Sequence, residues 1–294
     1  MEYNLKVYNY ADNRKQIRIY SNTIERDTKR TEEINEKRQN KKQIKKERGL
    51  DSDREWSATV SKNRTIQNIY HVCRANKFEW FITFTFDKRR VDRQNYDDCI
   101  WAASSWIKET NRRYKTDLKY VLIPEFHDDH KSWHIHALFG ELGNIELKEA
   151  VNPKNGKLLK DKKGRQIYNL PTYFYGFSTA TKIDDNFAAI AYCTKYITKS
   201  LCTEIRNRKR YITSHNLKRP EVEEHIINKY EKDNFIDSIK DKILNIKEKE
   251  FGEEKITFIE IDGDLEELND YDIKIRNMER SEWGCDNVQI NFDW

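Results

Sequence analysis

Residues 118–139 read LKYVLIPEFHDDHKSWHIHALF, two apolar runs joined by a short charged segment. Both runs have the β-branched and aromatic content of strands, and HDDHKS (127–132) has the composition of a turn. This pattern predicts an antiparallel hairpin. If the turn is centred between Asp129 and His130, residue i of the first strand lies opposite residue 259 − i of the second.

Two histidines interrupt the second strand at positions two apart. His134 and His136 therefore point to the same face, about 7 Å apart along the strand. The predicted register places Glu125 across from His134, about 5 Å away at the Cβ atoms. Two imidazoles and a carboxylate suit Mn²⁺, Co²⁺ or Zn²⁺ and leave coordination positions open, so we expect a metal site, with His127 as a spare ligand. The alternative is a solvent-facing strand edge with no ligand.

The flanking segments predict an α+β fold. Apolar residues alternate in 78–87 (FEWFITFTFD) and 173–183, which indicates strands, and 152–169 is typical of a charged surface hairpin. Apolar positions three and four apart indicate helices over about 56–75, 92–114 and 184–201, the last capped by Asp184 or Asp185. We expect an antiparallel central β-sheet with helices packed on one face.

Three regions differ in charge. We expect a basic N-terminal extension (1–54), a catalytic domain (55–220) and a charged, acidic C-terminal extension (221–294). Both extensions are expected to be helical, with a solvated helix or disordered arm over 26–48 and a helix over 235–250, followed by a possible strand at 255–261.

Composition favours an acidic polymer as partner. The net charge is +5; residues 251–294 hold thirteen acids and four bases, which is −9, so residues 1–250 carry +14. A basic body of this kind favours nucleic acid, although lysine-rich surfaces are common in other proteins.

Membrane and secreted classes are not indicated. No apolar run approaches the roughly 18 residues of a membrane span, and residues 1–16 lack the apolar stretch of a signal peptide. The five cysteines show no CxxC spacing, so we expect reduced packing residues in a cytoplasmic protein.

The helix expected at 184–201 carries phenols and ammonium groups on one face. Tyr192, Lys195, Tyr196 and Lys199 follow the spacing i, i+3, i+4 and i+7, opposite a packing face of Phe187, Ile190, Thr194, Ile197 and Leu201. A nearby lysine or cation lowers the cost of forming phenolate, so a tyrosine nucleophile is one interpretation. A wet amphipathic helix with half-buried aromatics is the other.

Taken in order, FITFTFD (81–87), PEFHDDHKSWHIHALF (124–139) and YCTKYITK (192–199) resemble the three motifs of the HUH endonuclease superfamily, in particular the rolling-circle replication initiators of plasmids and single-stranded DNA phages. RYITSHNLKRP (210–220) resembles a segment that often follows the third motif. The resemblance covers about residues 55–220. It implies an antiparallel sheet with the histidine strand at its centre, and no GxxxxGK[ST] helicase motif accompanies it.

The resemblance implies a metal-dependent nickase and strand transferase. Glu125, His134 and His136 match the ligands of Mn²⁺ or Mg²⁺, Tyr192 the nucleophile, Tyr196 the second tyrosine, and Lys195 and Lys199 the lysines that orient the phosphate or assist the phenol. The implied partners are single-stranded origin DNA and a host helicase and polymerase, with no membrane. An HUH transposase or relaxase, a non-catalytic origin-binding regulator and a zinc-stabilised structural protein are the alternatives.

Overall fold

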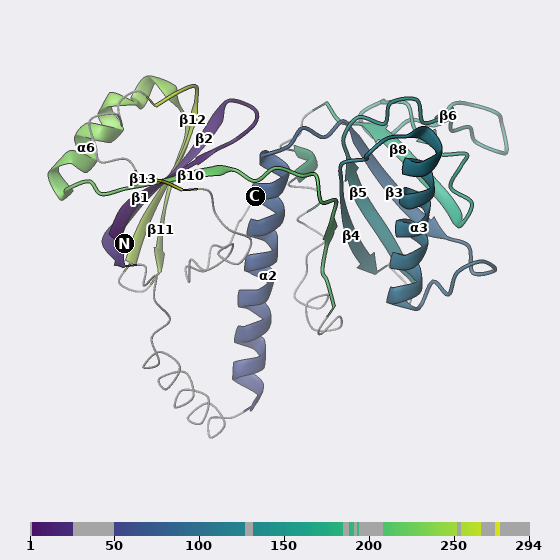
Figure 1. Ribbon diagram of the computed structural model, residues 1–294, viewed down its shortest axis with the longest axis horizontal. Helices are drawn as coiled ribbons and strands as arrows, with labels where there is room; N and C mark the ends of the chain where they lie inside the picture. Colours follow the sequence, from purple (N-terminus) through teal and green to yellow (C-terminus); the bar gives the residue numbers. More distant parts are fainter. Residues whose placement is uncertain are drawn as a thin grey trace. The chain divides into compact units, whose positions relative to one another are not determined.

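The computed structural model describes residues 2–25, 50–126, 132–184, 188–190, 193, 208–251, 254–265 and 274–276. Within these residues the chain forms two antiparallel sheets, each in its own compact unit (Figure 1). One unit contains residues 64–218. The other combines the beginning of the chain, up to residue 63, with residues from 219 onward. The predicted α+β class is confirmed, and the functional boundaries at 54/55 and 220/221 stay predictions.

The central unit is built on a seven-stranded sheet, counted over the described residues, with the order β6-β7-β8-β3-β5-β4-β9. Its strands are β3 (Trp80–Phe86), β4 (Tyr120–Phe126), β5 (Trp133–Phe139), β6 (Lys148–Glu149), β7 (Tyr168–Asn169), β8 (Gly176–Lys182) and β9 (Ile212–Thr213). The hairpin predicted from residues 118–139 is present. Its histidine strand, β5, lies between β3 and β4 inside the sheet.

One helix, α3 (Tyr96–Tyr114), covers one face of this sheet (Figure 1). It begins where the side chain of Asn95 accepts a hydrogen bond from the Asp97 amide. Trp106 of α3 is 1% exposed and packs against Phe84 of β3 and Phe139 of β5, with ring centroids 5.3 and 6.1 Å apart. The apolar residues that alternate along β3 and β5 therefore face α3, and the residues between them face the opposite side.

The second unit joins the two ends of the chain. Its six strands, among the described residues, have the order β11-β12-β2-β1-β10-β13. They are β1 (Glu2–Asn9), β2 (Arg14–Glu25), β10 (Glu221–His225), β11 (Ile243–Phe251), β12 (Glu254–Asp262) and β13 (Lys274–Arg276), with the helices α6 (Lys229–Ser238) and η1 (Lys240–Lys242). The long helix α2 (Leu50–Arg74) begins in this unit and ends in the central one.

The expectation of helical extensions is therefore wrong for the described residues. Leu5 and Val7 of β1 pair with Ile19 and Ile17 of β2, so the period-two pattern of each segment is satisfied by the other. Residues 243–250, expected to continue a helix, form β11, because they pair along their length with β12. The expected strand at 255–261 is present as part of β12, and 26–48 lies outside the described residues.

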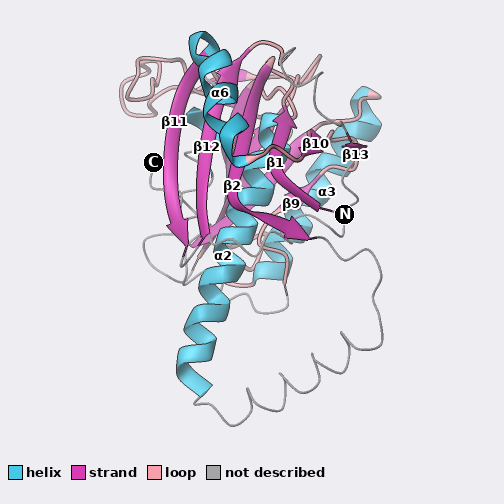
Figure 2. Ribbon diagram, turned by 90° about the vertical axis from the view of Figure 1, so that its left-hand side faces the viewer, coloured by secondary structure: helices cyan, strands magenta, loops and turns pink. Residues whose placement is uncertain are grey.

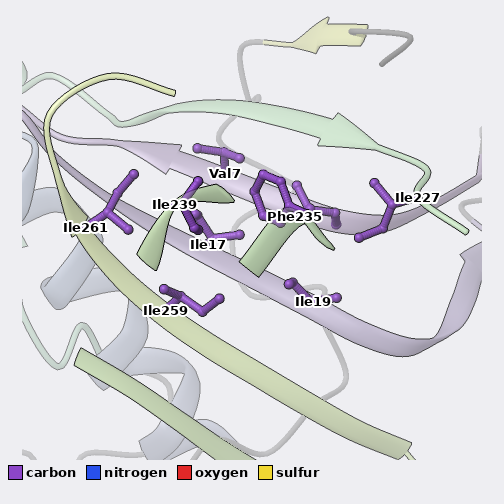
Figure 3. Packing of buried hydrophobic residues seen from close by; sticks show 9 residues of the cluster. Val7, Ile17, Ile19, Ile227, Phe235, Ile239, Ile259 and Ile261 are labelled. Carbon is purple, nitrogen blue, oxygen red and sulfur yellow. The ribbon is translucent and has the colours of Figure 1, made fainter. Parts of the chain in front are cut away.

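Helix α6 lies against one face of the six-stranded sheet, across β12 and β2 (Figure 2). Phe235 of α6 and Ile239 just after it fit among apolar side chains of four strands or their ends (Figure 3). The cluster consists of Leu5, Val7, Ile17, Ile19, Ile227, Phe235, Ile239, Ile259 and Ile261. This core is separate from the one beneath α3. No helix among the described residues is both long and apolar enough to cross a membrane.

Candidate functional site

The register of the central sheet brings the predicted ligands onto one face. Glu125 of β4 lies directly opposite His134 of β5, as the sequence predicted. On the other side of β5, Thr85 lies opposite His134 and Thr83 opposite His136. Because Phe84 and Ile135 between these positions face α3, the five polar side chains share the opposite face. We call this the histidine face.

His136 is held from three sides. Its Nε2 atom is hydrogen-bonded to Glu125 Oε2 at 2.6 Å, and its Nδ1 atom to Thr83 Oγ1 at 3.1 Å. The Phe81 ring stacks against the imidazole at 5.6 Å between centroids and 22° between planes. The imidazole is only 8% exposed. These contacts fix both the position and the rotation of the ring.

The donor set fits a divalent cation. Glu125 Oε2 and His136 Nε2 are 2.6 Å apart, close to the roughly 3 Å that separates two ligands of one small cation. The Glu125 side chain is 30% exposed, so the carboxylate is accessible to an ion from solvent. Among the described residues no three His, Cys, Asp or Glu side chains already converge as a metal cluster. His134 is placed beside the pair by the register, and the spare candidate His127 lies outside the described residues.

The residues predicted to carry the chemistry, Tyr192, Lys195, Tyr196 and Lys199, lie outside the described residues. Residues 188–190 and 193 are helical, and Ile190 and Cys193 are 1% and 0% exposed. Burial raises the pKa of the Cys193 thiol, and burial together with the nearby Cys193 raises that of Cys73. Burial of Ile190 agrees with the predicted packing face; the face of Tyr192 stays a prediction. Cys73, Cys99 and Cys193 are buried and not disulfide-bonded, as expected.

An arginine that the sequence did not single out anchors the chain between β8 and this helix. Arg165 Nη1 donates to the Lys182 carbonyl at 3.0 Å and to Asp184 Oδ2 at 3.2 Å, while its Nε donates to Asp161 at 2.7 Å. Asp184, predicted as a helix cap, is thus tied to the charged hairpin. The sequence signal was weak, because Arg165 is one of many bases between 152 and 169.

Phe177 was also missed. Its side chain is 78% exposed on β8, where it lies opposite Thr85 on the histidine face. The available signal was its company, because Phe177 alternates with Ser178 and Ala180 but shares a face with Thr179 and Thr181. A large ring in a row of threonines is unusual for a face that packs on a core.

One comparison with known proteins gives a match. Residues 79–201, less than half of the chain, match the model of a family described as replication-associated protein ORF2. The matched range contains the histidine face and the tyrosine motif. No curated protein and no solved structure matches the chain. The family match supports a role for this chain in the initiation of replication.

Proposed function

We propose that the chain nicks and rejoins single-stranded DNA at a replication origin, as an HUH-type rolling-circle initiator. The observation that carries the proposal is the Glu125–His136 contact on a sheet face where Glu125 also lies opposite His134. The tyrosine motif follows within the same replication-associated match. A carboxylate and two imidazoles beside an exposed surface are suited to phosphodiester chemistry.

Tyr192 is the nucleophile in this proposal. Its phenol oxygen attacks the scissile phosphorus in line and loses its proton, while the bond to the 3′ oxygen breaks and that oxygen takes up a proton. The products are a 5′-phosphotyrosine and a free 3′-hydroxyl. Lys195 and Lys199 orient the phosphate or assist loss of the phenol proton. Tyr196 attacks the regenerated site after one round, and the hydroxyl released then closes the displaced strand.

Glu125, His134 and His136 would hold Mn²⁺ or Mg²⁺, which when bound polarises the scissile phosphate and stabilises its developing charge. Thr83 sets the orientation of the His136 ring. A hydroxyl both donates and accepts hydrogen bonds, so Thr83 can serve Nδ1 in either tautomer. Neutral imidazole with Nδ1–H donating to Thr83 leaves Nε2 available to a cation.

The partners follow from the products. Single-stranded origin DNA is the substrate, and the free 3′-hydroxyl is a primer for a host polymerase, with a host helicase to open the duplex. The phosphotyrosine conserves the energy of the broken phosphodiester, so rejoining needs no nucleoside triphosphate.

A covalent adduct tests the proposal. The full chain is incubated with pooled single-stranded oligonucleotides and Mn²⁺, and denaturant-resistant adducts are separated by gel and weighed. We expect an adduct that maps to Tyr192 and disappears in Tyr192→Phe. Tyr196→Phe is expected to keep cleavage and impair rejoining, and Tyr114→Phe, at the end of α3, is the matched control.

An equal yield of adduct from Tyr192→Phe contradicts the assignment of the nucleophile. Binding of the oligonucleotides with no adduct in any divalent cation contradicts nicking and favours a non-catalytic origin-binding protein.

A further inference from the structure

One transverse row of residues crosses four strands of the histidine face. Phe177 of β8 lies opposite Thr85 of β3, Thr85 opposite His134 of β5, and His134 opposite Glu125 of β4. Neighbouring strands are about 4.8 Å apart, so the Phe177 backbone lies roughly 10 Å from that of His134. The exposed ring and the proposed cation ligands therefore belong to one surface.

The position of Phe177 is fixed closely by its neighbours. A Cβ atom at Gly176 would lie 2.0 Å from the carbonyl oxygen of Thr85, so only glycine allows β8 to approach β3 so closely here. Ser178 and Ala180, which face α3, are 5% and 0% exposed. The alternation leaves the Phe177 ring on the histidine face, with most of its surface in water. A solvated benzyl group on a rigid strand is suited to stacking on another flat, apolar surface.

A basic loop runs along the end of the sheet beside this row. It follows β3 and consists of residues 87–95. Near β8, the Asp87 amide donates to the Tyr175 carbonyl at 2.9 Å, and the Arg90 guanidinium donates to the Phe174 carbonyl. At β5, the Trp133 amide donates to the Arg93 carbonyl at 2.8 Å, next to His134. The loop thus passes from the Phe177 end of the row to the His134 end.

The loop presents positive charge. Lys88, Arg89, Arg90 and Arg93 are exposed, against Asp87 and Asp92, which gives 4 − 2 = +2. Residues 88–94 line a shallow hollow of about 440 Å³. Arg89 makes a bidentate pair with Asp87, with Nη2–Oδ2 at 2.7 Å, and these hydrogen bonds lower the pKa of Asp87 to about 2. The pair restrains the start of the loop, while Arg93 is exposed beside the strand that carries His134.

We propose that Phe177 and the 87–95 loop form a nucleotide-binding subsite for single-stranded DNA, in which the ring stacks on one base and Arg93 contacts a backbone phosphate near the cleaved link. This inference rests on the proposed function, because it assigns the substrate's contacts beside that site. An unpaired base offers a bare face for stacking, and a phosphate matches the arginine charge. Bases inside a duplex are already stacked on each other, so the subsite selects single strands.

The stacking contact is tested by binding in the absence of cleavage. The full chain with Tyr192→Phe is titrated, in EDTA, into a single-stranded oligonucleotide that contains 2-aminopurine, and anisotropy and base fluorescence are recorded. Phe177→Leu, which keeps an apolar side chain but no ring, is expected to weaken binding about 10-fold and to reduce quenching. Phe177→Tyr is expected to retain both. Trp101→Leu, which removes a 60% exposed ring on α3, is the matched control and is expected to bind normally.

The phosphate contact is tested by salt dependence. For a single strand, removing one interaction between a cationic side chain and a phosphate reduces the slope of log K against log salt by about 0.7. Arg93→Gln is expected to reduce the slope by this amount, and Lys108→Gln, an exposed cation on α3, to leave it unchanged. Circular dichroism melting of each variant shows whether the fold is retained.

The outcomes separate this inference from the proposed function. Equal binding by Phe177→Leu and the parent, or equal salt slopes for Arg93→Gln and Lys108→Gln, overturns the subsite even if the Tyr192 adduct forms. Loss of binding in Phe177→Leu but not Phe177→Tyr supports the subsite even if no adduct forms. Binding of an acidic peptide as tight as that of the oligonucleotide, with the same dependence on Phe177, overturns the assignment to DNA.

Discussion

The two sheets treat their polar faces in opposite ways. Each has an apolar face covered by a helix, α6 in one and α3 in the other. In the six-stranded sheet the other face carries Lys6 and Arg18, which are 0% and 1% exposed. In the seven-stranded sheet the other face carries His134 and Thr85, which are half-buried, and the exposed Phe177. One polar face is part of the interior, and the other meets solvent.

The difference shows what a buried charge requires. Lys6 Nζ lies 3.5 Å from Glu224, and the Arg18 guanidinium lies 4.5 Å from the centre of the Tyr8 ring and donates to Gln16. Such interactions compensate for the hydration that burial removes, so these residues are built into the fold. On the histidine face the carboxylate of Glu125 is partly solvated and can exchange its partner. Alternation of polar residues is thus common to both sheets, and accessibility distinguishes chemistry from structure.

Breaking the buried ion pair should have the largest effect. Lys6→Met leaves Glu224 buried without its cation, and we expect it to lower the free energy of unfolding of its unit by about 3–5 kcal/mol. Hydrogen exchange of peptides from 2–25 should accelerate, while peptides from 133–139 should keep their protection. Adding Glu224→Leu should restore part of the loss. Equal acceleration in both sheets contradicts the separation between them.

Gly176→Ala tests the close approach that positions Phe177. The new methyl group would overlap the Thr85 carbonyl, and we expect a loss of about 2–3 kcal/mol in stability as β8 moves from β3. Gly140→Ala is the matched control, because its Cβ would lie 3.3 Å from a Lys119 side-chain carbon. Chemical denaturation of both variants gives the comparison. A Gly176 variant as stable as the Gly140 variant means that β8 is not held tightly.

The central sheet was predictable from local pattern, and the second sheet was not. The register that places Glu125 opposite His134 depends on one hairpin and its turn. The six-stranded sheet pairs Leu5 with His225, residues 220 positions apart, and no local signal identifies such partners. Residues 243–250 have spacings compatible with a helix, and pairing with β12 decided for a strand. Phe177 was missed for the same reason, because alternation assigns a face but does not tell which face stays open.

Thr83→Val tests whether the histidine face is tuned for a cation. The change keeps the shape and removes the hydroxyl at His136 Nδ1, and loss of such a partner usually weakens metal affinity 10- to 100-fold. Calorimetric titration with Mn²⁺ measures the change. Thr179→Val, at the neighbouring position of β8, is the control and should bind Mn²⁺ normally. Equal affinities in the two variants mean that Thr83 does not orient a ligand.

The smallest expected effect concerns acid and the six-stranded sheet. A hydrogen bond from His225, with a second from Asn9 and with Lys15 nearby, holds the pKa of Glu223 below its ordinary value of 4.5. A carboxyl with a lowered pKa in the folded state stabilises the fold above that ordinary value, and the contribution is lost as pH falls through the folded value. Because Glu223 is half-buried and screened, we expect only about 0.5 kcal/mol. Hydrogen exchange of peptides from 221–225, compared between about pH 6 and pH 3 after correction for the intrinsic exchange rate, measures it. Glu223→Gln should flatten this dependence without changing that of peptides from 133–139, and an unchanged profile would show that the acid sensitivity of this sheet arises elsewhere.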